Sequence, residues 1–296
     1  MHAPYQRTLR ANAKLNLLLR ILERGAGGYH GIETVFQRLA LHDLVHVSVN
    51  DGTRSVNCDG PSLPPEGLGD ETKNIAWRAA EQYATAAGWD TGWHIEIEKR
   101  IPVGGGLGGG SADAAAVLRA LEAMCPSPLG NGALMELAST IGADVPFLLS
   151  DASLALAWGR GDRLLSFPAL PEMGVTMVTF DDGVSTGEAY AAVSWTREDG
   201  ARSPGGMHYP ASAFADWQAL SALAVNDFED VVPAMHDGVR EVLPLVQDEA
   251  ARLRAAGFPA IGQLSGSGAT CFIVHPLDVS VQLSPAVGSV RCTKTS

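Results

Sequence analysis

The chain has 296 residues and a formal net charge of −12, and both values limit what it can be. The length predicts about two domains with a sizeable core. The excess of acidic residues argues against a nucleic-acid-binding surface. It also means that any anionic substrate must be bound by local hydrogen-bond donors and not by the overall charge of the protein. The four cysteines lie far apart without a C-x-x-C pair, which argues against a disulfide framework or a zinc site. Because we find no signal-peptide pattern and no apolar run of membrane-span length, we expect a cytoplasmic protein without a membrane segment.

Hydrophobic periodicity predicts strands and helices mixed along the whole chain. The expected strands are 5–22, 32–49 as two runs with a turn near His42-Asp43, 93–98, 154–158, 163–167, 175–180 and 271–274. The expected helices are 72–87 with Thr72 as a candidate cap, 114–124, 133–141 and 239–256. Residues 50–70 are polar and rich in proline and glycine, which predicts a surface excursion. The lack of strict βαβ alternation favours an α+β class in two domains, 1–152 and 153–296.

The segment 102–112 holds six glycines and no charge, and it lies between a predicted strand and a predicted helix. Glycine lets the backbone approach a ligand closely, and the free N–H groups of a first helical turn favour an anion. The sequence therefore predicts a phosphate-binding loop. The alternative is a flexible connector, which is disfavoured because linkers seldom lie tightly between a strand and a strong helix.

Three familiar nucleotide-binding patterns do not account for this loop. The spacing of Gly104, Gly106 and Gly109 formally fits a dinucleotide fingerprint, but a helix follows where a second strand with an acidic residue is needed. No lysine follows the glycines as in a Walker A loop, and the protein-kinase elements are absent. What remains is a cradle of backbone N–H groups and Ser111, with a metal ion supplying positive charge.

Five side chains outside the loop could carry chemistry. If 5–22 is a strand, Lys14 and Asn16 face the same side, although a lone lysine commonly reaches water from a strand end. Tyr29 and His30 on a turn could read a nucleobase by stacking and hydrogen bonding, or they could cover the core and remain solvated. Asp144 precedes a proline that can open a short helix, so an N-cap is its simplest role.

Three separated blocks, 11–16, 102–115 and 264–271, together resemble the galactokinase, homoserine kinase, mevalonate kinase and phosphomevalonate kinase (GHMP) superfamily. They occur in the family's order and span nearly the whole chain. Further segments resemble a branch that acts on a diphosphocytidyl-linked alcohol, namely 28–30, 142–146, 183–186 with Tyr190, and 226–229. The resemblance implies a two-domain α+β fold, with an N-terminal domain like ribosomal protein S5 and a ferredoxin-like C-terminal domain.

The resemblance also implies transfer of the γ-phosphoryl group of ATP to a hydroxyl group of a small cytidyl diphosphate substrate, with Mg²⁺ as cofactor. It implies Asp144 as the catalytic base and Lys14 as its charged companion. The implied ATP-binding residues are Pro102, Val103, Gly104, Gly105, Gly106, Leu107, Gly108, Gly109, Gly110, Ser111, Ala112, Asn74 and Lys99, with Ser111 also a metal ligand. The implied substrate-binding residues are Asn16, Tyr29, His30, Thr186 and Tyr190. We expect a monomer or weak homodimer with no nucleic-acid or membrane partner.

One departure and two alternatives accompany this interpretation. Gly27 stands where the family usually has an aspartate, so a loop hydrogen bond or substrate contact is missing there. Another GHMP-type kinase, acting on homoserine or mevalonate, would not need Tyr29, His30 or Tyr190. A nucleotide-binding regulatory protein without catalysis is the second alternative, and the presence of both an implied base and its companion argues against it.

Overall fold

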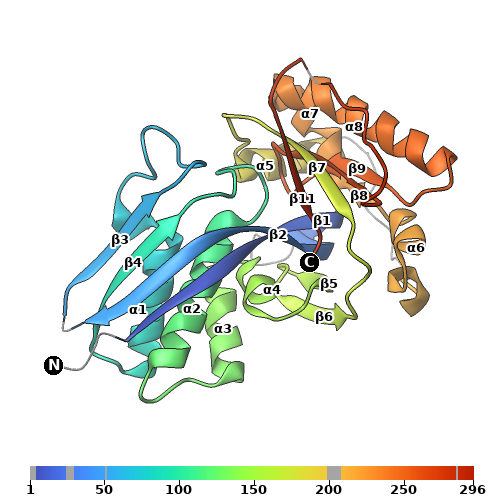
Figure 1. Ribbon diagram of the computed structural model, residues 1–296. Coiled ribbons are helices and arrows are strands. Elements are labelled where there is room, and N and C mark those ends of the chain that lie inside the picture. The colour runs from blue at the N-terminus through green and yellow to red at the C-terminus, as the bar shows by residue number, and fades with distance from the viewer. Residues whose placement is uncertain (1–4, 25–29, 51, 199–207, 285) are drawn as a thin grey trace. The chain divides into compact units, whose positions relative to one another are not determined.

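The computed structural model describes residues 5–24, 30–50, 52–198, 208–284 and 286–296 (Figure 1). Gly27 and Tyr29, which the sequence singled out, lie outside these ranges. The chain divides into two compact units: the first comprises residues 1–13, 41–103 and 108–151, and the second comprises residues 14–40, 104–107 and 152–296. The long strands β1 (Gln6–Arg24) and β2 (His30–Asn50) contribute residues to both units.

The first unit consists of a sheet with helices on one face (Figure 1). The later part of β2 pairs antiparallel with β4 (Gly92–Glu98), and β3 (Arg54–Asp59) pairs parallel with β4. A short 3₁₀ helix (Glu71–Lys73) precedes the helices, which are α1 (Ile75–Ala87), α2 (Gly109–Met124), α3 (Asn131–Ile141) and α4 (Val145–Leu149). The helix-covered face is apolar because alternate residues of β4 are buried, namely Trp93, Ile95 and Ile97.

The second unit contains the other parts of β1 and β2 and a separate antiparallel sheet. Strand β8 (Val225–Asn226) pairs parallel with β1, while β5 (Leu154–Gly159) pairs antiparallel with both β2 and β6 (Arg163–Phe167). The separate sheet has the order β11 (Ser289–Lys294), β7 (Gly174–Thr179), β10 (Cys271–His275), β9 (Ile261–Leu264). The helices of this unit are α5 (Thr186–Glu198), α6 (Trp217–Ser221), α7 (Val232–Met235) and α8 (Asp237–Ala255), with 3₁₀ helices at Ala211–Phe214 and Asp227–Asp230.

Helix α8 lies directly against β9 in the second unit. Its buried residues recur with helical spacing and include Val239, Val242, Val246 and Ala250, which form its apolar face. Gly262 of β9 permits the close approach, since a Cβ atom there would collide with the carbonyl oxygen of Val246. This packing fixes the strand that leads into the second glycine-rich segment of the chain.

The mixed α+β class is confirmed, but several expected boundaries are wrong. The strand over 32–49 is continuous, because the Asp43 carboxylate is buried and accepts backbone hydrogen bonds where a turn was expected. The expected excursion over 50–70 contains β3. Asn74, not Thr72, caps α1, and α2 begins at Gly109 rather than at 114. Strand β11 was not expected at all.

Among the described residues, no helix combines the length and the apolar character needed to cross a membrane. The division into domains 1–152 and 153–296 stays a prediction, since the compact units follow the long strands rather than a single cut in the chain.

Candidate active site

The glycine-rich loop turns at alternate residues. Gly104, Gly106 and Gly108 have φ angles of 76°, 73° and 73°, a region that residues with side chains rarely adopt. A Cβ atom on Gly106 would also collide with the carbonyl oxygen of Ser265. Gly108 is the N-cap of α2 and has no capping side chain, so the first N–H groups of this helix are left to another partner. This is the arrangement expected of an anion-binding helix terminus.

Lys14 lies on β1 and is only 3% exposed. Its Nζ atom donates hydrogen bonds to Asn16 Oδ1 over 2.7 Å and to the carbonyl oxygen of Gly106 over 2.9 Å. Its backbone N–H donates to the carbonyl oxygen of Leu107 over 3.0 Å. The expectation that Lys14 and Asn16 face the same side is confirmed, and the alternative of a lysine reaching water is wrong. The burial places a cation beside the glycine-rich loop.

Asn16 is held by partners from two other strands, β2 and β9. Its Nδ2 atom donates to Thr34 Oγ1 over 2.8 Å, and the Thr34 hydroxyl in turn donates to the carbonyl oxygen of Leu18 over 2.7 Å. Gln263 donates through Nε2 to the backbone oxygen of Asn16 over 2.9 Å. Lys14, Asn16, Thr34 and Gln263 are all buried, and we call them the polar cluster. A cluster with this many bonds fixes the direction of each side chain before any ligand binds.

The second glycine-rich segment, 265–270, lies against the first. Ser265 donates through Oγ to the carbonyl oxygen of Gly106 over 3.0 Å, so this oxygen accepts from both Ser265 and Lys14. Asn226 donates through Nδ2 to the carbonyl oxygens of Leu264 and Gly266, each over 2.8 Å. The sequence singled out the segments 226–229 and 264–271 only as matching blocks and gave their residues no role.

Glu229 holds the start of the same segment. Its Oε1 accepts from the Leu264 N–H over 2.8 Å, and its Oε2 accepts from Gln247 Nε2 over 2.9 Å. Burial raises the pKa of Glu229 to about 7, although these two hydrogen bonds oppose the rise. No local pattern singles out Glu229, because it lies among other acidic residues in the segment 227–230.

His30 and Tyr190 come together in the second unit. Their ring centroids lie 5.6 Å apart with an interplanar angle of 10°, and Tyr190 also meets the edge of Phe228 with centroids 4.9 Å apart. A base sandwiched between the two rings would need a centroid separation of roughly 7–8 Å, so a base would stack on one outer face or separate the rings. Thr186 lies close to the second glycine-rich segment, with its hydroxyl 2.8 Å from Ser267 Oγ.

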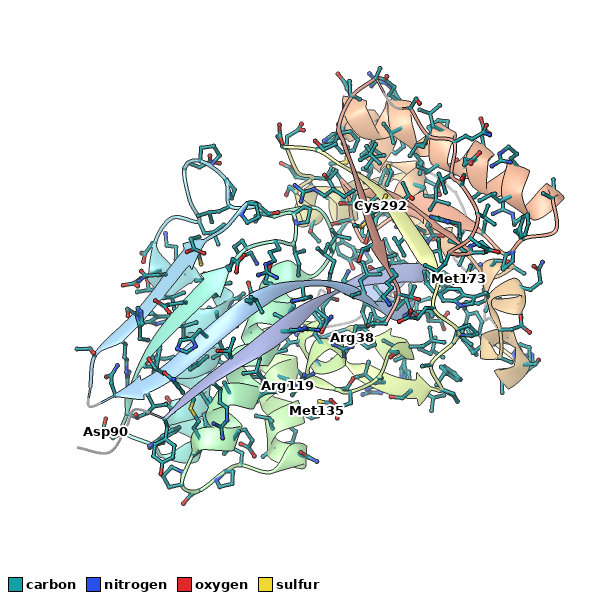
Figure 2. All side chains as sticks on the ribbon, viewed as in Figure 1. Arg38, Asp90, Arg119, Met135, Met173 and Cys292 are labelled. Carbon is teal, nitrogen blue, oxygen red and sulfur yellow. The ribbon has the colours of Figure 1, made fainter. Side chains whose placement is uncertain are left out.

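Asp144 stands at the N-cap position of α4, but its side chain makes no capping hydrogen bond. Its backbone oxygen accepts from the Leu148 N–H over 3.1 Å. The expected capping role of the carboxylate is therefore wrong. The far end of α4 is held by Arg119 of α2, which is labelled in Figure 2. Its guanidinium donates to the carbonyl oxygens of Leu148, Leu149 and Ser150 over 2.7–3.0 Å. This bonding fixes the helix that follows Asp144.

Asn74 and Lys99, the two expected ATP contacts outside the loop, are both engaged by the protein. Asn74 caps α1 by accepting from the Ala76 N–H over 2.9 Å. Lys99 is 3% exposed, and its Nζ donates to Asp43 and, over 2.6 Å, to Asp113. These contacts support a structural role for the Lys99 ammonium. They do not support a direct contact between this ammonium and ATP.

The charges of this buried group influence one another. Burial raises the pKa of Asp113 to about 8, although the neighbouring Lys99 opposes the shift. Burial alone would lower the pKa of Lys99, but Asp113 and Asp43 together raise it above its usual value. The ammonium therefore stays protonated, while Asp113 holds a proton more readily than an ordinary aspartate.

The described residues contain no group of three or more histidine, cysteine, aspartate or glutamate side chains arranged to hold a metal ion. A dedicated all-protein metal cage is therefore absent from this part of the chain. Mg²⁺ in phosphoryl-transfer sites keeps several waters and is bound largely by the nucleotide phosphates. The half-buried Ser111, in the first turn of α2, fits that kind of site as a single hydroxyl ligand.

Comparison with known proteins agrees with this arrangement. Residues 74–151 match the family of GHMP kinases N terminal domains. The 4-diphosphocytidyl-2-C-methyl-D-erythritol kinase of Desulfitobacterium hafniense is 35% identical, covering 88% of this chain and 84% of the relative. The kinase of the same name from Pelotomaculum thermopropionicum is 38% identical, covering 90% of this chain and 88% of the relative.

Solved structures give the same result for the fold. A crystal structure of 4-(cytidine 5'-diphospho)-2C-methyl-D-erythritol kinase superposes with a TM-score of 0.68 at 32% identity, covering 98% of this chain and 99% of that one. The mevalonate kinase of L. major superposes with a TM-score of 0.62 at 17% identity, covering 95% of this chain and 91% of that one, which shows a shared fold alone. The expected GHMP kinase fold is confirmed.

Proposed function

Because the chain belongs to the family of 4-diphosphocytidyl-2-C-methyl-D-erythritol kinases, we propose that it phosphorylates the 2-hydroxyl group of that diphosphocytidyl alcohol with ATP. The reaction belongs to the non-mevalonate route to isoprenoid precursors. The observation that carries the proposal is the position of Lys14. Its buried ammonium bonds to Asn16, the proposed acceptor-binding residue, and to Gly106 in the proposed donor-binding loop.

The donor half of the reaction relies on the loop from Pro102 to Ala112. Its glycines bring backbone N–H groups close to the phosphates, and the first turn of α2 adds the positive end of the helix dipole. Ser111 would hold Mg²⁺, which when bound neutralises charge on the phosphates. Positioning and charge neutralisation supply most of the catalysis in phosphoryl transfer.

The acceptor half relies on Asp144, Lys14 and Asn16. An alcohol is a poor nucleophile at neutral pH, so a carboxylate that takes its proton helps, typically by about 10²–10⁴-fold in rate. We assign this task to Asp144, whose side chain is not used for capping. Lys14 stabilises the negative charge that develops on the attacking oxygen, and Asn16 orients the alcohol. The hydrogen bonds of the polar cluster support the two assignments on β1.

The cytidyl group is assigned to His30 and Tyr190, with Thr186 and Tyr29 as further proposed contacts. A ring stack offers one face for the base, and the imidazole nitrogens can bond to the cytosine edge. Homoserine and mevalonate have no base to stack, so this pair favours the diphosphocytidyl substrate over the other GHMP-type acceptors.

An ADP-release assay with ATP and three acceptors tests the proposal. We expect turnover with 4-diphosphocytidyl-2-C-methyl-D-erythritol and turnover at least about 100-fold lower with homoserine or mevalonate. Preferred turnover of homoserine or mevalonate would establish the other kinase class instead. ATP binding without turnover of any of the three would favour a non-catalytic nucleotide-binding protein.

We also propose that residues 1–152 form an ATP-binding domain and residues 153–296 a C-terminal GHMP kinase domain, acting in the cytoplasm as a monomer or weak homodimer without nucleic-acid partners. The net charge of −12 supports the last point. Light scattering of the purified chain across a concentration series would measure its oligomeric state.

A further inference from the structure

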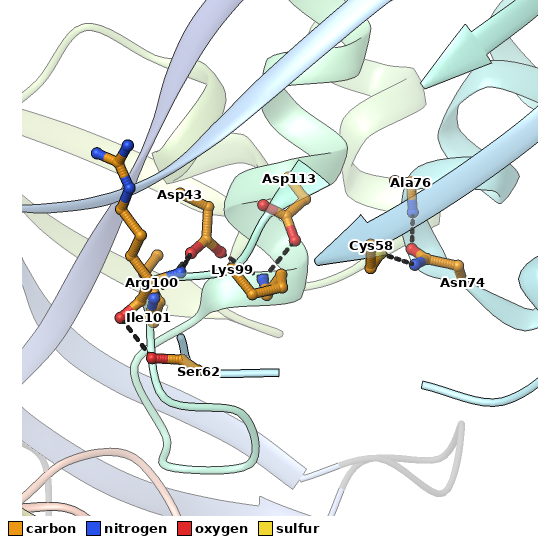
Figure 3. A network of polar contacts seen from close by, with 9 residues as sticks. All are labelled: Asp43, Cys58, Ser62, Asn74, Ala76, Lys99, Arg100, Ile101 and Asp113. Atoms are coloured by element: carbon orange, nitrogen blue, oxygen red, sulfur yellow. Dashed lines mark hydrogen bonds and ion pairs between the residues drawn. The ribbon is translucent and has the colours of Figure 1, made fainter. Parts of the chain in front are cut away.

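Lys99 lies between two carboxylates in the interior of the first unit (Figure 3). Its Nζ atom donates to Asp43 Oδ2 and, over 2.6 Å, to Asp113 Oδ2. Asp43 comes from β2, Lys99 follows β4, and Asp113 lies on α2. Their exposed fractions are 0%, 3% and 3%. One ammonium therefore joins three elements without access to water.

The same group holds the chain at the entrance to the glycine-rich loop. Asp43 Oδ1 accepts from the backbone N–H of Arg100 over 2.5 Å and of Ile101 over 2.7 Å (Figure 3). These residues immediately precede Pro102, where the loop begins. Asp43 thus uses both carboxylate oxygens, one for Lys99 and one for the backbone before the loop.

The exit from the loop is held through the same ammonium. Asp113 is the fifth residue of α2 and lies three positions after Gly110, the last glycine of the loop. The Nζ atom of Lys99 would lie only 3.5 Å from a Cβ atom on Gly109, so the side chain passes against the first turn of the helix. The entrance and the exit of the loop are therefore joined by two hydrogen bonds to one buried ammonium.

We infer that Asp43, Lys99 and Asp113 form a buried clamp that holds both ends of the glycine-rich loop at the spacing required for ATP binding. The clamp consists of positioning residues, and its effect on ATP rests on the proposed kinase function. Backbone N–H groups bind phosphate well only when they converge on it before the ligand arrives. A buried ion pair also fails badly when one partner is lost, because the remaining charge is stranded.

The clamp predicts a selective defect. Asp113→Ala removes one anchor of Lys99, so the loop ends separate more easily and the affinity for ATP falls by about 10–100-fold. The KM for the acceptor should change less than about twofold, since no clamp residue belongs to the polar cluster. Asp113→Asn keeps an acceptor oxygen of the same shape and should recover most of the loss. Lys99→Met should reproduce the defect of Asp113→Ala.

Hydrogen–deuterium exchange on the ligand-free full chain tests the clamp independently of any substrate. We expect Asp113→Ala to speed amide exchange in peptides that cover residues 100–112, with α3 and the strands of the first unit unchanged. Unchanged exchange over 100–112, or an equal increase throughout the first unit, would overturn the inference. Because no acceptor is present, this result stands whether or not the diphosphocytidyl alcohol is turned over.

Tyr83→Phe is the matched control. The Tyr83 hydroxyl donates to Glu122 Oε2 over 2.6 Å, near the opposite end of α2 from the loop. Its loss should lower stability without speeding exchange over 100–112 or changing the KM for ATP. If Tyr83→Phe and Asp113→Ala raised the KM for ATP equally, the clamp would be a general contribution to stability, and the inference would be wrong.

Discussion

The Nζ atom of Lys14 lies 2.9 Å from the carbonyl oxygen of Gly106, and this bond joins residues 92 positions apart in the chain. A carbonyl oxygen holds the ammonium in place without neutralising its charge. The ammonium is therefore held against the loop by a direct hydrogen bond, and the side chain is almost completely buried. This relationship underlies the first prediction.

Lys14→Met should lower kcat by at least about 100-fold while leaving the KM for the acceptor within about threefold, because the charge is needed most when the attacking oxygen becomes negative. Lys14→Arg should not restore activity, since a planar guanidinium does not fit a buried site shaped for an ammonium. Steady-state ADP release measures both. Arg10→Met, at an exposed position on the same strand, is the control. Activity of Lys14→Met near the control would exclude a catalytic charge at this position.

Asp144→Asn should retain ATP binding and lose about 10²–10⁴-fold in turnover, because an amide cannot accept the proton of the alcohol. Its stability should change far less than its turnover, since asparagine has nearly the same shape and no capping hydrogen bond is lost. Nucleotide titration measures ATP binding, ADP release measures turnover, and urea unfolding measures stability. Near-normal turnover of Asp144→Asn would show that Asp144 is not the catalytic base.

His30→Ala and Tyr190→Ala should each raise the KM for the diphosphocytidyl alcohol by about tenfold and leave the KM for ATP unchanged. Because the two rings are in contact, the double variant should lose less than the sum of the two free-energy changes. A double-mutant cycle in kcat/KM measures this coupling. A change confined to the KM for ATP would show that His30 and Tyr190 act on ATP and not on the diphosphocytidyl alcohol.

Gly106→Ala should nearly abolish activity, because its φ of 73° and the neighbouring Ser265 carbonyl oxygen both exclude a side chain. We expect a loss of at least about 100-fold in kcat/KM for ATP, since the cradle would be displaced. Gly132→Ala is the control, because it lies in α3 with open space around it. That control should keep full activity and gain up to about 1 kcal/mol in the free energy of unfolding.

The raised pKa of Glu229 predicts that the stability of the chain changes with pH. Its pKa in the folded chain is about 7, well above the usual value near 4.5, so the folded state binds the proton more tightly than the unfolded state. The contribution of the protonated side chain is therefore fully present below about pH 4.5 and is lost as the pH rises to about 7. Glu229→Gln removes this dependence, on the order of 2 kcal/mol.

Urea unfolding of the unmodified chain and of Glu229→Gln at pH 5 and pH 8 measures this difference. The advantage of the glutamate over the glutamine should be larger at pH 5 than at pH 8. Asp230→Asn controls for removal of the exposed carboxylate next to Glu229. An equal difference at both pH values would contradict a raised pKa for this residue.

Local pattern was sufficient for part of the fold and part of the site. The period of two in β1 placed Lys14 and Asn16 on one side, and their hydrogen bond follows directly from that spacing. The glycine run between a strand and a helix indicated a helix terminus without a side-chain cap, which α2 has. Signals of this kind depend only on neighbours in the chain.

Contacts between distant segments could not be predicted in the same way. Asp43 looked like part of a turn because it is polar and follows a histidine, but its partner Lys99 lies 56 residues away and makes its burial favourable. Lys99 was expected among the ATP-binding residues only through the family resemblance, and its two buried carboxylate partners could not be read from the sequence. The roles of Thr34 and Gln263 likewise depend on the polar cluster. Its members lie on separate segments, so no local pattern predicts it.

The bond from Gln263 to the backbone of Asn16 joins residues 247 positions apart, and the bond from the Ile21 N–H to Asp227 spans 206 positions. A growing chain on the ribosome therefore exposes the polar groups of β1 long before their partners have been synthesised. Long-range contacts of this kind form late and leave intermediates open to aggregation and proteolysis. The polar cluster can therefore be completed only in a chain extended past residue 263.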